Sequence, residues 1–96
     1  MQDQIGNEFT AAQQYVAIAV YFDGEDLPQL AAHFYRQAVE ERNHAMMIVR
    51  YLLDKGADVE IPGVPPVVNN FDSVRAPVEL ALRQEREVTD QVTRLA

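Results

Sequence analysis

The sequence lacks cysteine, long apolar runs and an excess of basic residues, and each absence excludes a class of protein. Without cysteine there is no disulfide framework and no thiolate metal site, so a metal ion would need oxygen and nitrogen ligands. The longest apolar run, YVAIAVYF, is far shorter than the roughly 20 residues that cross a bilayer. The opening residues, MQDQIGNEF, have neither region of a signal peptide. The sequence therefore predicts a cytoplasmic protein without a membrane partner.

Acidic residues outnumber basic ones, with 15 Asp and Glu against 8 Lys and Arg and a net charge of −7. A nucleic-acid partner would need a basic patch, so the charge argues against one and is compatible with cations as ligands. The 96 residues fit one domain, residues 1–96, near the lower limit of chains that bury an independent core. We therefore expect a homo-oligomer in which partner chains share the stability.

Two helices are predicted in the first part of the chain, at residues 4–22 and from 27 to 54 or 55. In each, residues three or four apart form one packing face. The first face holds Ile5, Glu8, Ala12, Tyr15, Ala19 and Phe22, and the second holds Leu30, Phe34, Gln37, Glu41, His44, Ile48 and Tyr51. Between them, Gly24 is expected as a left-handed cap and Asp26 as an N-cap. The short turn predicts an antiparallel hairpin.

A long proline-containing segment follows at residues 56–74, GADVEIPGVPPVVNNFDSV, and cannot be helical throughout. It is longer than an antiparallel hairpin needs, so it predicts a crossover along the bundle and a third helix parallel to the second. The helical spacing resumes at about Ala76, and its face holds Val78, Leu82, Glu85, Val88, Val92 and Leu95. The expected fold is an all-α helix bundle.

Each predicted helix carries one carboxylate on its packing face, namely Glu8, Glu41 and Glu85, and His44 follows Glu41 by three residues. Because residues three apart lie about 5–6 Å from each other, Glu41 and His44 can share a metal ion. A glutamate three residues before a histidine is weak evidence alone. The prediction of a metal site therefore depends on the fact that all three glutamates lie on the packing faces of their helices. Unpaired buried carboxylates are very unfavourable, whereas divalent cations between them would neutralise the charge.

The ligand types favour iron or manganese, because carboxylates with one imidazole and no thiolate differ from a structural zinc site. A bridging carboxylate suits a di-iron centre in a helix bundle, and Glu41, between Glu8 and Glu85, is expected to take that role. Tyr15, on the same face, is the other catalytic candidate. It either donates a hydrogen bond to a ligand, supplies an electron, or is an interior aromatic residue with a satisfied hydroxyl. Glu40 points about 100° away and is expected in solvent.

Four stretches of the chain resemble bacterial non-haem ferritins. QIGNEFTAAQQYVAIAVYF and FYRQAVEERNHAMMIVRYLL resemble the first two helices of these proteins, IPGVPPVVNNFDS the long crossover, and ALRQEREVTDQVTRL the third helix. The combination of N-E-F, a tyrosine seven residues after that glutamate, E-E-R-x-H-A and a later Q-E is specific. The resemblance covers essentially the whole chain and is close to the actinobacterial type often labelled bacterioferritin B.

The resemblance implies a ferritin-like four-helix bundle with a di-iron ferroxidase centre, in which Tyr15 stands beside the ligands Glu8, Glu41, His44 and Glu85. It implies Fe(II) and O2 or peroxide as reactants, and storage of ferric oxide in a homo-oligomeric shell of twenty-four subunits. No haem is implied, because the methionine position that binds haem in true bacterioferritins has no match. Glu40 matches a position that serves a third iron site in some bacterial ferritins.

The chain departs from the family pattern because it ends before the fourth helix, which carries further ligands. Two alternatives to a complete ferroxidase therefore stay open. One is a non-catalytic structural or assembly fragment. The other is a half-ferritin, whose symmetric dimer builds the di-iron site from two copies of Glu8, Glu41 and His44 and leaves Glu85 peripheral.

Overall fold

The computed structural model of the chain describes residues 2–95, and side chains from residue 3 to residue 86. Three helices make up the fold: α1 (Gln2–Gly24), α2 (Pro28–Asp54) and α3 (Arg75–Leu95). Within that described part no strand occurs, and no helix is long and apolar enough to cross a membrane. The prediction of an all-α fold is confirmed.

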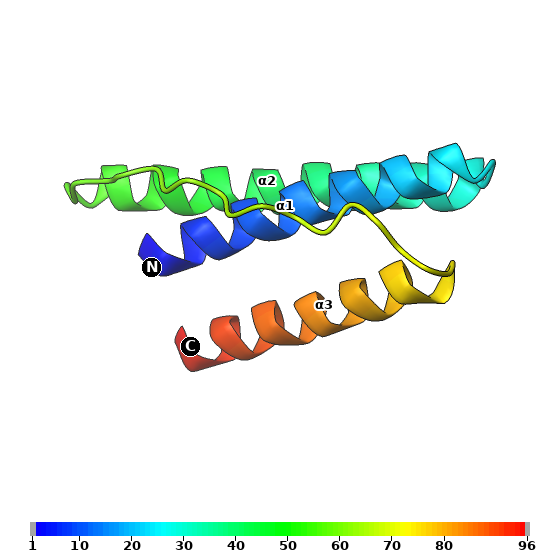
Figure 1. The fold of residues 1–96 in the computed structure, drawn as a ribbon. Helices are drawn as coiled ribbons and strands as arrows, with labels where there is room; N and C mark the ends of the chain where they lie inside the picture. The colour runs from blue at the N-terminus through cyan, green and yellow to red at the C-terminus, as the bar shows by residue number, and fades with distance from the viewer. Residues whose placement is uncertain (1, 96) are drawn as a thin grey trace.

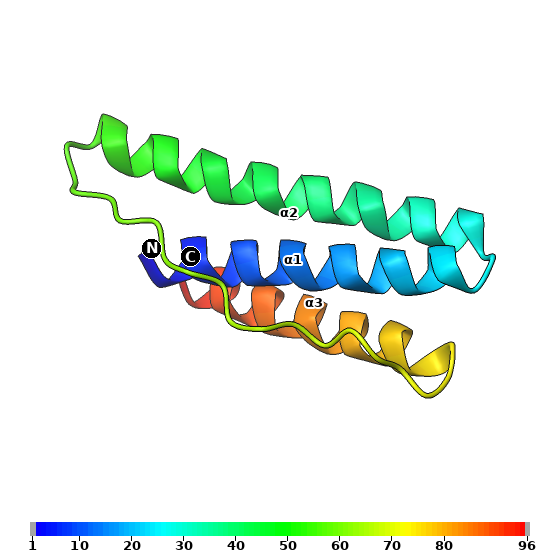
Figure 2. The ribbon, with the colours of Figure 1, turned by 45° about the horizontal axis from the view of Figure 1, so that its top comes forward.

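The helices lie lengthwise beside one another, as Figures 1 and 2 show. α1 and α2 form an antiparallel hairpin, the crossover returns along the whole bundle, and α3 then runs parallel to α2. This is the topology that the long crossover predicted. It brings the start of α1 and the end of α3 to the same end of the molecule (Figure 1).

The core lies around α1, which contacts both other helices. Every residue of its predicted packing face is buried: Ile5, Glu8, Ala12, Tyr15, Ala19 and Phe22. Phe34 of α2 packs between two aromatic rings of α1, with ring centroids 5.9 Å from Tyr15 and 5.6 Å from Phe22. Ala81 of α3 closes the same cluster. α1 therefore supplies the scaffold that fixes its neighbours.

The predicted packing faces of α2 and α3 are only partly correct. The buried residues of α2 are Ala31, Phe34, Ala38, Glu41, Ala45 and Val49, so only two residues of the predicted face are among them. The reason is geometric: α2 packs against α1, and no Cα pair of α2 and α3 lies within 8 Å in the described residues. Tyr51 of α2 and Leu82 of α3, both on the predicted faces, are exposed. The side chains of Val88, Val92 and Leu95 lie outside the described ones.

The turn between α1 and α2 differs from the expected one. Asp26 is not the N-cap; Leu27 holds that position and makes no side-chain cap hydrogen bond. The left-handed residue is Asp26, with φ 59°, while Gly24 still belongs to α1. Aspartate tolerates this conformation, so the turn uses its backbone freedom rather than its capping ability. At the other end of α2, Gly56 has φ 78° and follows the helix end, a conformation that suits glycine.

The crossover is fastened to α1 by the side chain of Gln14. Its amide nitrogen donates a hydrogen bond of 2.7 Å to the Val68 carbonyl, and its amide oxygen accepts one of 2.8 Å from the Val68 N–H. Gly6 makes room for the same segment, because a Cβ there would lie 3.1 Å from Cγ of Pro62. These contacts hold the crossover along the hairpin and thereby fix where α3 begins.

Candidate metal centre

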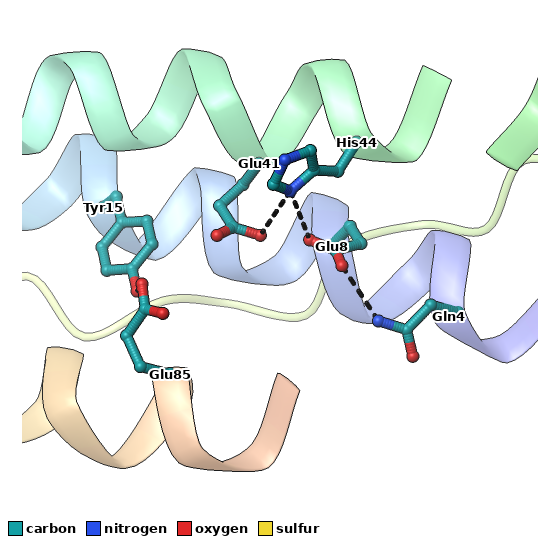
Figure 3. A network of polar contacts seen from close by, with 6 residues as sticks. All are labelled: Gln4, Glu8, Tyr15, Glu41, His44 and Glu85. Carbon is teal, nitrogen blue, oxygen red and sulfur yellow. Dashed lines mark hydrogen bonds and ion pairs between the residues drawn. The ribbon is translucent and has the colours of Figure 1, made fainter. Parts of the chain in front are cut away.

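Glu8 of α1 and the pair Glu41 and His44 of α2 come together in the interior of the hairpin. One ligand atom from each lies within 4.8 Å of the other two. Nδ1 of His44 is 4.0 Å from Oε2 of Glu8 and 4.0 Å from Oε2 of Glu41 (Figure 3). The helical spacing brings Glu41 beside His44, and the antiparallel hairpin adds Glu8 from the opposite helix. We call these three residues the carboxylate–histidine group.

The carboxylate–histidine group is buried on one side and open on the other. Glu8 and Glu41 are 3% and 5% exposed, whereas the His44 side chain is 56% exposed. Oε2 of Glu8 and Oε2 of Glu41 are both buried without a hydrogen-bond partner. Buried carboxylate oxygens without partners are unfavourable, and a cation between them would satisfy both. Oxygen ligands with one imidazole suit Fe(II), and the open side gives an ion a route of entry.

Glu41 is electrostatically perturbed. Burial raises its pKa from 4.5 to about 8, and the neighbouring carboxylates of Glu8, Glu85 and Glu40 add to the shift. At neutral pH the Glu41 carboxyl therefore holds a proton when no cation is near. A divalent cation would reverse this preference, so its binding displaces the proton.

The raised pKa of Glu41 predicts how the stability of the metal-free chain depends on pH. Since the folded-state pKa lies above the unfolded one, its contribution to stability is complete below about pH 4.5 and is lost as the pH rises through 8. The destabilisation of the folded state by Glu41 therefore increases between pH 5 and pH 8.5. Glu41→Gln, which stays neutral, is expected to remove this part of the pH dependence and to melt several degrees higher than the unsubstituted chain at pH 8.5.

Thermal unfolding followed by circular dichroism in the presence of a chelator measures the effect. The matched control is Glu25→Gln, a change of an exposed carboxylate in the turn after α1. Equal melting temperatures for the Glu41→Gln variant and the unsubstituted chain at pH 8.5 would contradict the assignment of the proton to Glu41.

Gln4 is a site residue that sequence reasoning missed. It is 4% exposed, and its Nε2 donates a hydrogen bond of 2.9 Å to Oε1 of Glu8 (Figure 3). The bond orients the Glu8 carboxylate and leaves Oε2 directed at the other two members of the group. The signal was present in the sequence, because Gln4 precedes Glu8 by one helical turn on the same side of α1.

Glu85, the fourth predicted ligand, lies apart from the carboxylate–histidine group. Its Oε1 accepts a hydrogen bond of 2.6 Å from the Tyr15 hydroxyl (Figure 3). Burial and the Glu85 carboxylate raise the pKa of Tyr15, so the phenol stays protonated and donates. Both residues border an open pocket of about 410 Å³ between α2 and α3. Glu40 is exposed on α2, as expected.

The site residues thus form the carboxylate–histidine group, to which Gln4 is bonded, and a separate pair, Tyr15 and Glu85. The structure brings together three of the four predicted ligands, and it places the fourth on the tyrosine that was predicted to stand beside them. Glu85 nevertheless acts on Glu41, because its charge contributes to the raised pKa of that carboxyl. The arrangement therefore offers three groups that could hold a cation, and a further carboxylate within electrostatic range of Glu41.

Comparison with protein families gives a match over the whole chain. Residues 1–96 match the model of the ferritin-like domain. Ferritin BfrB of Mycobacterium tuberculosis is 74% identical over 95 residues, which are 99% of this chain and 52% of the relative. Ferritin BfrB of Mycolicibacterium smegmatis is 68% identical over 96 residues, 100% of this chain and 53% of the relative. The chain therefore spans about half the length of these relatives.

Proteins of lower sequence identity that match the chain are also ferritins or resemble it in fold. The bacterial non-heme ferritin of Staphylococcus aureus is 38% identical over 89 residues, 93% of this chain and 54% of the relative. Among solved structures, the crystal structure of a PmFTN variant soaked in iron superposes with a TM-score of 0.92 at 27% identity. The match covers 98% of this chain and 60% of that one. The three helices and the crossover therefore have the arrangement found in that structure.

Proposed function

Because the chain belongs to the ferritin-like domain family, we propose that it stores iron and oxidises Fe(II) to Fe(III) at a two-ion centre. The observation that supports this function is the carboxylate–histidine group, whose two buried oxygens have no hydrogen-bond partner. Fe(II) is the substrate in this proposal. One ion would be held by Glu8, Glu41 and His44, and a second by Glu41 and Glu85, with Glu41 bridging.

The residues of the chain supply charge, orientation and proton release. Glu8, fixed by Gln4, offers an unpartnered oxygen, and Glu41 releases its proton as the cation arrives. Tyr15 holds Glu85 through its hydrogen bond and so positions that carboxylate on the far side of the centre. The iron supplies the redox chemistry, since each Fe(II) gives up one electron to O2 or peroxide. The proposal requires no haem.

Ferric mineral storage would take place in a homo-oligomeric shell, which is the arrangement implied by the resemblance to bacterial ferritins. The relatives named ferritin are about twice as long as this chain, so the shell is proposed for the whole protein. For the present residues, the proposal concerns the capture and oxidation of Fe(II).

Adding Fe(II) in air to the metal-free chain tests this function. We expect a ferric absorbance that rises much faster than in buffer alone, and Fe(II) binding in an anaerobic titration. Sedimentation of the same samples, with the bound iron counted, gives the oligomeric mass. A small oligomer that takes up no iron would favour the alternative function, an assembly module without turnover.

A further inference from the structure

An open groove of about 390 Å³ runs along the α1–α2 hairpin and borders the crossover. We call it the hairpin groove. Two buried alanines form its floor, Ala12 of α1 and Ala38 of α2. Larger apolar side chains surround this floor, namely Phe9, Val16, Tyr35, Val39 and, from the crossover, Val64. The lining includes none of the three residues of the carboxylate–histidine group, so the groove is a separate feature of the hairpin.

Helix geometry gives the hairpin groove a direction. On α2, Tyr35, Val39 and Arg42 follow one another at intervals of four and three residues, so they lie on the same side of the helix. Tyr35 and Arg42 are about 10 Å apart along the axis. Because α1 and α2 are antiparallel (Figure 2), Arg42 lies at the Phe9 end of the groove and Tyr35 at the Val16 end.

The walls of the hairpin groove are apolar and yet exposed. Val39 is 58% exposed, and Val16 and Tyr35 are each 38% exposed. Apolar side chains that gather around a hollow indicate a binding surface more than single exposed ones do. The volume falls within the range of small-molecule sites, roughly 300–1,000 Å³.

The two ends of the hairpin groove carry opposite charge. Arg42 is the only charged side chain of the described lining, and it forms no ion pair among the described residues. At the other end, the Tyr35 hydroxyl donates a hydrogen bond of 3.3 Å to Oδ2 of Asp23, which places a carboxylate there. An anionic group is therefore favoured at the Arg42 end and disfavoured at the Tyr35 end.

We propose that the hairpin groove binds a free medium-chain alkyl carboxylate. Its carboxylate pairs with the Arg42 guanidinium, whose planar fork matches two carboxylate oxygens. Its alkyl chain lies over the alanine floor and extends toward Tyr35. A length of about 10 Å suits a chain of roughly ten carbons. The inference uses no residue of the iron site and does not depend on the proposed function.

A second copy of the chain fits the hairpin groove less well. A contact between identical surfaces sets groove against groove. The described lining contains one guanidinium and no carboxylate, so such a contact would bring two cations together without a partner for either. The alkyl carboxylate satisfies the charge and the apolar walls at once.

Calorimetric titration of the metal-free chain with decanoate, below the concentration at which decanoate forms micelles, tests the inference. We expect one decanoate per chain and binding about 10-fold tighter than that of octanoate, which has two methylenes fewer. Arg42→Gln should weaken decanoate binding at least about 10-fold, because it removes the charged hydrogen bonds. The same substitution should leave the binding of decanol, which has no charge, nearly unchanged.

Two controls match the change in charge and the alkyl chain. Arg36→Gln removes an exposed arginine of α2 that does not line the groove, and should bind decanoate as the unsubstituted chain does. Decyltrimethylammonium has the same alkyl chain with a cationic head, and should bind at least about 10-fold more weakly than decanoate. Circular dichroism of each variant confirms that it is folded.

Three results would overturn the inference. One is equal binding of decanoate and decyltrimethylammonium, which is non-specific adsorption of alkyl chains. Another is equal affinity of the Arg42→Gln and Arg36→Gln variants for decanoate. The third is no binding of decanoate by the unsubstituted chain. If that chain also sediments as a dimer that Val39→Asp converts to a monomer, a second copy occupies the groove.

Discussion

Glu41→Ala is expected to slow the formation of ferric absorbance by at least about 100-fold. Even hydrogen-bond partners of metal ligands contribute about 10- to 100-fold to affinity or activity, and Glu41 is proposed to contact both ions itself. It is also a buried residue whose pKa the neighbouring carboxylates raise. No other residue of the group combines these roles, so its loss should have the largest effect in the chain.

The measurement is the initial rate of ferric absorbance after aerobic addition of Fe(II), at equal protein concentrations. Glu41→Gln serves as a second variant, because the amide has nearly the same shape as the protonated carboxyl that burial favours and so keeps the fold. Glu25→Ala removes one exposed carboxylate elsewhere and controls for the change in net charge. Rates in both Glu41 variants equal to that of the Glu25→Ala variant would refute the proposed site.

The hairpin part of the site was predictable because its geometry is local. Glu41 and His44 share one turn of α2, and their proximity follows from helix geometry alone. Glu8 joins them because α1 has an uninterrupted packing face, every residue of which is buried, and because a short turn fixes the hairpin. In such an element the apolar period and the tertiary contacts agree, so the sequence pattern indicates the buried side correctly.

The position of Glu85 was not predictable in the same way. The spacing of apolar residues in α3 shows which side of the helix is apolar. It does not show how close that side lies to α2. That distance depends on the path of the crossover, which Gln14 fastens at Val68 through contacts between residues far apart in the sequence. The hydrogen bond from Tyr15 then decides where the Glu85 carboxylate points. The prediction that Asp26 is an N-cap was also wrong. In the turn Asp26 takes a left-handed backbone conformation, and this role is not visible in its capping preference.

The difference between Glu8 and Glu85 leads to the second large effect, measured as the number of ions bound. Glu8 belongs to the three-ligand group, whereas Glu85 lies across from it on α3. Glu8→Ala is therefore expected to abolish tight binding of the first ion, because it leaves one carboxylate and one imidazole for that ion. Glu85→Ala should keep the first ion and lose the second, so that half of the anaerobic binding capacity remains while ferric formation slows strongly.

Anaerobic titration with Fe(II), together with Co(II) as a coloured probe of the same ligands, measures both quantities. Tyr15→Phe is the matched control for Glu85, since it removes the hydrogen bond to that carboxylate and keeps the carboxylate itself. It should retain both ions and weaken only the second. If Glu85→Ala binds as many ions as the unsubstituted chain, Glu85 is peripheral. The symmetric half-ferritin would then be favoured, because in it two copies of Glu8, Glu41 and His44 suffice for both ions.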